Sequence, residues 1–142
     1  MLVLAVPGAA LAQPPWPQSV RFHLVSWHDR GDFNNANLGI GLRWNRGLTL
    51  GGYQNSFGRA SWYGGITMPL FEGHALQLEL MTGVVSGYSD SSPADLVAVP
   101  SLGWRPTQRG SLQVVFMPRF VIPANVVHVM YEWRLGVPRE SH

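Results

Sequence analysis

The sequence contains no cysteine and no lysine, and only 13% of its 142 residues are charged. The absence of cysteine excludes disulfides, thiolate catalysis and cysteine-ligated zinc or iron–sulfur centres. A soluble surface usually has roughly a quarter or more of its residues charged, so a chain with so little charge is expected to meet something other than water. The basic residues are ten scattered arginines against eight acids, and no basic block indicates a nucleic-acid partner.

The sequence also lacks any run of 18 or more apolar residues, so an embedding in a membrane would have to use strands rather than helices. Its length allows one ordinary domain. The apolar start ends in Ala10-Leu-Ala12, a small-x-small pattern that signal peptidases accept. We predict a signal peptide over residues 1–12 whose cationic start is missing, a Pro-rich segment over 13–19, a barrel domain over 20–135 and a tail over 136–142. The alternative for the start is a short buried segment.

Short segments with a period of two follow from Val20 onward, separated by Gly, Pro, Asn, Asp and Ser. This pattern predicts eight strands, and hence an all-β, eight-stranded antiparallel up-and-down barrel of the outer-membrane type. The expected strands cover residues 20–27, 38–45, 48–54, 61–70, 75–87, 95–104, 111–118 and 126–135.

The faces of these strands favour a barrel in the outer membrane. The segment 126–135 alternates valines and aromatics with His128 and Glu132, and the segment 75–87 alternates leucines with Gln77 and Glu79. The more apolar face of most strands carries no charge, whereas a soluble barrel carries many charges on its outward face. A soluble exported binding barrel is the alternative. An even number of strands puts both termini on one side, and the longer loops are expected on the outer side.

The interior of an eight-stranded barrel has room only for side chains or one slender ligand. Residues 114–117 are apolar on both faces, so part of the interior is expected to be apolar; ordinary core filling is the alternative. His23 on the first strand and His28 at its end stand beside polar loops at the predicted outer rim. A histidine near a hydroxyl is the minimum for acyl chemistry, because imidazole can accept the hydroxyl proton near neutral pH. A solvated loop is the competing interpretation. No two histidines have a spacing, with nearby carboxylates, that defines a metal site.

Several segments resemble the family of outer-membrane lipid A palmitoyltransferases (PagP-like), and they follow one another in that family's order. Phe22-His-Leu-Val-Ser-Trp-His-Asp29 is similar to the first strand, which carries the catalytic histidine, and Leu50-Gly-Gly-Tyr-Gln-Asn-Ser-Phe57 is similar to the strand that ends in a catalytic Asp-Ser pair. The similarity continues through Phe33-Asn34, Gly39-Ile-Gly-Leu42, Met81-Thr-Gly-Val84, Val99-Pro-Ser-Leu-Gly-Trp104, Phe116-Met-Pro118 and residues 125–134.

The resemblance implies transfer of an acyl chain from a phospholipid to lipid A, without a cofactor, by a monomer in the outer membrane. Ser56 then takes the place of the family's serine and His23 that of its histidine, with His28 as a rival base nearer the loop of Ser56. Asn55 stands where the family has Asp, and an amide cannot carry the charge that stabilises an imidazolium. Pro100 and Pro118 resemble prolines that interrupt strand pairing and admit lipid, or they are simple strand ends.

Three functions therefore compete on the sequence alone. The first is an acyltransferase that acts on membrane lipids through the four residues His23, His28, Asn55 and Ser56. The second is hydrolysis of acyl esters, in which water replaces the lipid acceptor. The third is a barrel without enzymatic activity that is structural or binds a surface ligand through its Asn-rich loops.

Overall fold

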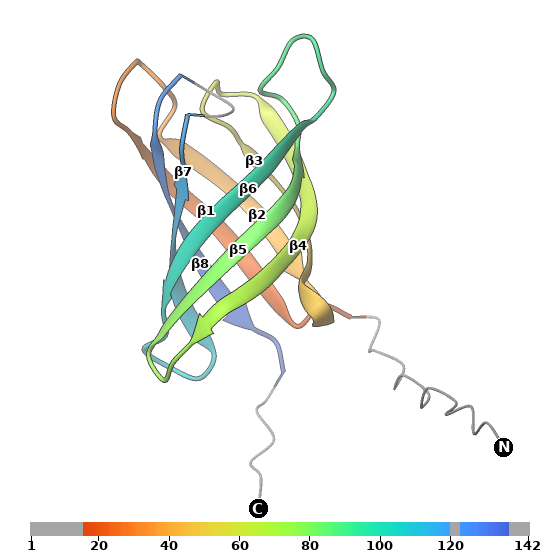
Figure 1. The fold of residues 1–142 in the computed structure, drawn as a ribbon, viewed down its shortest axis with the longest axis vertical. Coiled ribbons are helices and arrows are strands. Elements are labelled where there is room, and N and C mark those ends of the chain that lie inside the picture. The colour runs from red at the N-terminus through yellow and green to blue at the C-terminus, as the bar shows by residue number, and fades with distance from the viewer. Residues whose placement is uncertain (1–15, 120–122, 137–142) are drawn as a thin grey trace, which may run out of the picture.

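Eight antiparallel strands follow one another around a closed barrel in the computed structural model, which describes residues 16–119 and 123–136 (Figure 1). The strands are β1 (Ser19–His28), β2 (Ala36–Arg43), β3 (Leu48–Gln54), β4 (Ala60–Glu72), β5 (Leu76–Val85), β6 (Asp95–Trp104), β7 (Gly110–Met117) and β8 (Val126–Arg134). Each strand pairs with the next, and β8 closes the barrel on β1. The predicted fold class is confirmed. The predicted signal peptide and most of the predicted tail lie outside the described residues.

The strand bounds agree with the expected ones to within about two residues, and the largest shift has a visible cause. β2 begins and ends two residues earlier than expected, because a one-turn 3-10 helix, η1 (Asn45–Gly47), already forms the connection to β3. Gly47 has a φ of +84°, and a Cβ there would lie 2.0 Å from the carbonyl oxygen of Thr67. Only glycine fits this turn without displacing β4. The described residues contain no helix that is long and apolar enough to cross a membrane.

The exterior of the barrel is apolar, and most of its fully buried side chains are polar, as the alternation predicted. On β5, Leu76 and Leu78 are exposed while Gln77 and Glu79 are buried. The outward faces of the other strands are also apolar, and 25 large apolar side chains of the described residues are exposed. A soluble barrel has the reverse arrangement, so this barrel is of the outer-membrane type.

The two ends of the barrel differ in their connections. Four loops lie together at one end, which we call the loop rim (top in Figure 1); their described residues are 29–35, 55–59, 86–94, 118–119 and 123–125. Three connections of three to five residues, 44–47, 73–75 and 105–109, lie at the end where β1 begins and β8 ends, which we call the terminal rim. Exposed tryptophans lie near both rims: Trp27 and Trp62 near the loop rim, and Trp104 and Trp133 near the terminal rim.

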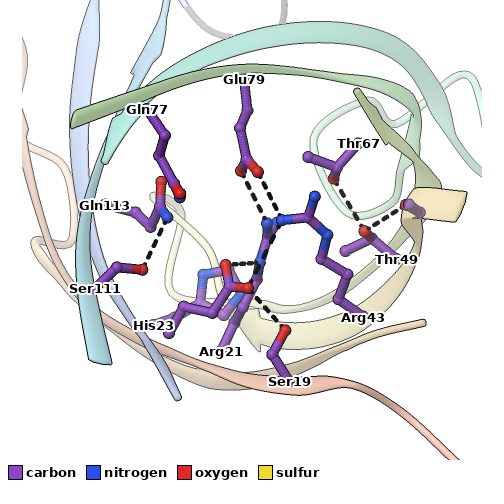
Figure 2. A network of polar contacts seen from close by, with 12 residues as sticks. Ser19, Arg21, His23, Arg43, Thr49, Thr67, Gln77, Glu79, Ser111 and Gln113 are labelled. Carbon is purple, nitrogen blue, oxygen red and sulfur yellow. Dashed lines mark hydrogen bonds and ion pairs between the residues drawn. The ribbon is translucent and has the colours of Figure 1, made fainter. Parts of the chain in front are cut away.

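A charged network fills the half of the interior toward the terminal rim (Figure 2). Arg21 donates to Glu132 at 3.0 Å and to Glu79 at 3.3 Å, and Arg43 donates to Glu79 at 2.7 Å. The hydroxyl of Ser19 adds a hydrogen bond of 2.7 Å to Glu132. Two guanidinium groups thus balance two carboxylates inside the barrel, which closes this half with side chains rather than leaving a pore.

One irregularity on β1 decides which of its side chains point inward. The register with both neighbouring strands shifts between His23 and Val25, so β1 carries a β-bulge there. Leu24 and Val25 are both exposed, and the next inward side chain is Ser26. A bulge adds one residue to a strand and reverses the alternation beyond it.

Candidate functional site

The loop rim brings together one serine and one histidine that the sequence singled out. Ser56 lies in the connection from β3 to β4 and is 3% exposed, and His28 is the last residue of β1. The Nε2 atom of His28 lies 2.8 Å from the Oγ atom of Ser56. The bulge on β1 makes this contact possible, because it turns His28 toward the barrel axis.

A third side chain orients this histidine. The Nδ1 atom of His28 lies 2.8 Å from the Oδ1 atom of Asn35, in the loop between β1 and β2. An amide oxygen can only accept, so Asn35 holds the imidazole proton on Nδ1 and leaves Nε2 free to accept the proton of Ser56. In this geometry a serine can act as a nucleophile, with the histidine as its base and the asparagine as the group that orients the histidine.

Tyr88, in the loop after β5, contacts the same serine. Its phenol oxygen accepts a hydrogen bond from the backbone N–H of Ser56, and its hydroxyl lies 2.6 Å from that of Tyr53. Burial raises the pKa of Tyr88, although the hydrogen bonds with Tyr53 and Ser56 act in the opposite direction. The phenol therefore stays protonated at neutral pH and is available as a hydrogen-bond donor.

Asn55 does not contact either histidine through its side chain. Its Oδ1 atom accepts hydrogen bonds from the backbone N–H groups of Phe57 and Arg59, and its Nδ2 atom donates to Ser61 Oγ and to the carbonyl of Gly87, both at 2.9 Å. The fully buried amide thus organises the loop that carries Ser56 and ties it to the next loop. Its geometry is that of a positioning residue.

His23, the other predicted base, lies deeper in the barrel and bonds to a different set of residues. Its Nδ1 atom is 2.8 Å from Nε2 of His128, and its Nε2 atom is 2.8 Å from the hydroxyl of Tyr63. The far nitrogen of His128 is 2.8 Å from the hydroxyl of Ser26. The ring of Tyr53 stacks on His23 at 5.0 Å between centroids. The structure therefore separates His23 from Ser56 and joins it to a buried chain of hydrogen bonds.

One glycine of β2 and one of β3 make room for the hydrogen-bonded residues around His23. A Cβ at Gly41 would lie 2.1 Å from the hydroxyl of Tyr63, and one at Gly51 would lie 2.5 Å from its ring. Any larger residue at these two inward positions would push Tyr63 away from His23.

A cavity of about 80 Å³ lies between the hydrogen-bonded residues around His23 and the opposite wall of the barrel. Its polar wall carries His23, Ser26 and His128, and Ser56 lines it from the loop rim. Its apolar wall consists of side chains from β5, β6, β7 and β8, namely Met81, Val85, Val97, Val99, Val115, Met117, Val126 and Met130. The expectation of a partly apolar interior on β7 agrees with Val115 and Met117 in this wall.

The wall of the cavity is incompletely paired between β6 and β7. Their ladder runs only from Trp104↔Leu112 to Ser101↔Val115, although β6 continues to Asp95. The next residue of β6 is Pro100, which has no N–H to donate, and Pro118 follows the end of β7. The two prolines that the sequence singled out thus flank the place where pairing ends.

The loops around Ser56 are held by contacts at the rim. The side chain and the backbone N–H of Asn125 donate to Asp29 at 2.8 and 3.0 Å, which links the loop after β1 to the loop before β8. Desolvation raises the pKa of Asp29, but the hydrogen bonds from Asn125 and the charges of Arg30 and Arg119 together outweigh it, so the pKa lies below its usual value.

Sequence reasoning did not identify Asn35, Tyr88 or His128 as site residues. The pair Asn34-Asn35 was visible only as part of an Asn-rich loop, and Tyr88 and His128 come from strands or loops whose neighbours the sequence does not specify. Within the described part of the chain, no three His, Asp or Glu side chains gather closely enough to hold a metal ion.

No protein-family model matches this chain, and no curated protein matches it. Among solved structures, it is similar to the solution NMR structure of the de novo designed TMB2.3, with a TM-score of 0.58 and 10% sequence identity. The alignment covers 87% of this chain and 98% of that one. At this identity the similarity supports the eight-stranded barrel fold alone. The resemblance to lipid A palmitoyltransferases stays a prediction.

Proposed function

We propose that this barrel resides in the bacterial outer membrane and transfers an acyl chain from a phospholipid to lipid A or a related lipid. The observation that carries the proposal is the contact of 2.8 Å between Ser56 Oγ and His28 Nε2, with Asn35 on the other nitrogen of the imidazole. The exposed apolar belt supports the location, because an uncharged outward face is stable in lipid and not in water.

The arrangement can perform acyl transfer in two steps. In the first, Ser56 Oγ bonds to the carbonyl carbon of the donor ester while its proton moves to His28 Nε2. The ester C–O bond then breaks, and His28 returns the proton to the leaving oxygen, which releases a lysophospholipid. In the second step, a hydroxyl of the acceptor gives its proton to His28 and attacks the acyl-serine; the bond between the acyl carbon and Oγ breaks, and His28 passes the proton to Oγ, which restores Ser56. Water in place of the acceptor gives hydrolysis, the phospholipase alternative.

Two neighbours would assist these steps. The Tyr88 hydroxyl, which contacts Ser56, can donate to the oxyanion that forms on the carbonyl oxygen. Asn35 orients the imidazole but supplies a dipole rather than a charge, so it stabilises the imidazolium less than a carboxylate would.

The cavity and the incomplete ladder support a lipid substrate. Ser56 stands where the cavity meets the loop rim, so an ester at Ser56 can extend its alkyl chain along the apolar wall. The β6–β7 gap beyond Ser101 offers a route from the bilayer into this space, because no strand hydrogen bonds have to break there.

Fractionation tests the location. We expect the full chain, expressed in a Gram-negative host, to be recovered with the outer membrane and to run as a heat-modifiable band on gels. Recovery in the periplasmic fraction without detergent would refute the membrane assignment and favour a soluble barrel.

Lipid analysis tests the chemistry in a host without its own lipid A acyltransferase. We expect overexpression to change the mass pattern of lipid A, and Ser56→Ala to abolish that change. His28→Gln should reduce turnover by about 10²–10⁴-fold, the usual contribution of a general base. Ser91→Ala, an exposed serine of the loop after β5, is the matched control and should leave the pattern as in wild type.

Three outcomes would change the proposal. Release of free fatty acid with unchanged lipid A would replace transfer by hydrolysis. Loss of turnover in His23→Gln with full turnover in His28→Gln would move the base into the barrel interior. Unchanged lipid A and phospholipids with a folded wild-type barrel would refute catalysis and favour a structural or ligand-binding barrel.

A further inference from the structure

The arginines of the two rims differ in their ion pairs. At the loop rim, Arg30 and Arg119 lie within 4 Å of Asp29, and Arg59 lies 3.1 Å from Asp90. The interior arginines pair with Glu79 and Glu132, as described above. The described terminal rim carries four more arginines, Arg46, Arg105, Arg109 and Arg134. None of them lies within 4 Å of a carboxylate among the described residues.

Two of these unpaired cations face one cavity. Arg105 and Arg134 line it together with His74 and three neutral residues of the connection from β6 to β7, and its volume is about 420 Å³. The Nη2 atom of Arg105 donates to Oε1 of Gln77, a neutral acceptor, so this hydrogen bond leaves the positive charge uncompensated. Its buried Nε atom has no hydrogen-bond partner among the described residues.

The cavity lies at the level where lipid headgroups would meet the barrel. Trp104 directly precedes Arg105, and Trp133 directly precedes Arg134. Both tryptophans are exposed, at 53% and 39%, and point outward at the ends of β6 and β8. Exposed tryptophans at strand ends sit at the membrane interface, with the phosphates just beyond them. The guanidinium groups are therefore held at phosphate level.

Other charges of this rim add to the attraction. Glu72, at the end of β4, is the only acidic residue in the described part of the terminal rim outside the interior network, against four arginines and His74. The loop rim, in contrast, carries aspartates beside each of its described arginines. The terminal rim thus has a net positive charge that its own side chains do not neutralise.

We propose that the cavity between the β4–β5 and β6–β7 connections binds the phosphate of an anionic phospholipid, with Arg105 and Arg134 as the ligating residues. Guanidinium groups present paired N–H donors that match phosphate oxygens, and an anion between two unpaired arginines relieves their mutual repulsion. A lipid is favoured over a free phosphate ion because the exposed Trp104 and Trp133, which directly precede the two arginines, place the cavity at the level of lipid headgroups. The inference rests on membrane insertion but not on acyl transfer.

Quenching of tryptophan fluorescence by brominated lipids measures this binding. We would use the full chain with Trp27→Phe and Trp62→Phe, which removes the fluorophores of the loop rim. In phosphatidylcholine vesicles, we expect brominated phosphatidylglycerol to bind at the terminal rim more tightly than brominated phosphatidylcholine. Each arginine near a charged lipid surface contributes about fivefold in affinity, so Arg105→Gln with Arg134→Gln should reduce the preference by about 25-fold.

Two variants control for charge and folding. Arg30→Gln with Arg59→Gln removes the same charge from the loop rim and should leave the preference intact. Arg105→Lys keeps the charge and should retain most of the preference, which separates loss of binding from loss of fold. Ser56→Ala should also retain it, so a failure of the proposed acyl transfer is distinguishable from a failure of this site.

Three results would overturn the proposal. The first is an equal affinity for the two lipids in the folded wild-type barrel. The second is a preference that survives Arg105→Gln with Arg134→Gln. The third is a preference that inorganic phosphate abolishes at constant ionic strength, which would assign the site to the free ion rather than to a lipid.

Discussion

Replacement of Arg21 by leucine tests the charged network that closes the barrel. The Arg21 side chain is 4% exposed and bridges Glu79 and Glu132, whose side chains are 3% and 7% exposed. In Arg21→Leu, two buried carboxylates remain against the single guanidinium of Arg43. Removal of one partner from a buried ion pair typically costs about 3–5 kcal/mol, because the remaining charge stays desolvated. We expect a loss of free energy of unfolding in that range.

Urea unfolding of the barrel in phosphatidylcholine vesicles measures the effect, with tryptophan fluorescence and the heat-modifiable gel band as independent probes. A second variant identifies the cause. Glu79→Gln in the Arg21→Leu background leaves Arg43 opposite Glu132, 3.7 Å apart, and restores neutrality. We expect it to recover about 0.5–3 kcal/mol, the usual size of coupling between contacting residues.

The matched control makes the same change in an exposed pair. Arg59 lies 3.1 Å from Asp90, and their side chains are 55% and 91% exposed. Arg59→Leu should cost about 0–1 kcal/mol, because solvent screens such a pair. If Arg21→Leu costs no more than Arg59→Leu, or if Glu79→Gln adds to the loss instead of reducing it, the argument that uncompensated charge sets the stability of this interior is refuted.

Three further predictions concern the lipid face, a turn and the loop of the site. Ile40→Arg places a charge on the exposed apolar face of β2 and should cost about 2–4 kcal/mol in vesicles if the residue lies near the bilayer midplane; unchanged urea stability would mean that this face does not meet lipid. Gly47→Ala should slow or prevent folding, seen as loss of the heat-modifiable band, because the added Cβ would lie 2.0 Å from the carbonyl oxygen of Thr67; wild-type folding yield would contradict this. Asn55→Asp should lower the melting temperature, because a carboxylate cannot donate to the carbonyl of Gly87 and leaves it unpaired at a cost of about 1–3 kcal/mol; an unchanged melting temperature would show that this bond is dispensable.

The sequence alone was sufficient to predict the barrel, its eight strands and the faces of most of them. Leucines and polar residues alternate along β5, and valines and polar residues along β8, because a strand directs successive side chains to opposite sides whatever it pairs with. The lack of charge on one face then indicated lipid rather than water. These features are local, so they are visible before any neighbour is known.

The site residues depended on contacts between strands, which the sequence does not specify. His23 and His28 are five residues apart, so strict alternation places them on opposite faces of β1. The β-bulge between His23 and Val25 adds one residue, and both histidines point inward. His28 thereby meets Ser56, while His23 lies one level deeper beside His128.

A bulge arises from the register of a strand with both of its neighbours, and register is a property of the closed barrel rather than of any one segment. The contacts of Asn35 and Tyr88 also depend on which loops the closed barrel brings together. So does the absence of a nearby carboxylate at the unpaired arginines of the terminal rim. The sequence therefore determined which residues face outward and which face the interior along regular strands, and only the tertiary structure decided which histidine lies within hydrogen-bond distance of Ser56.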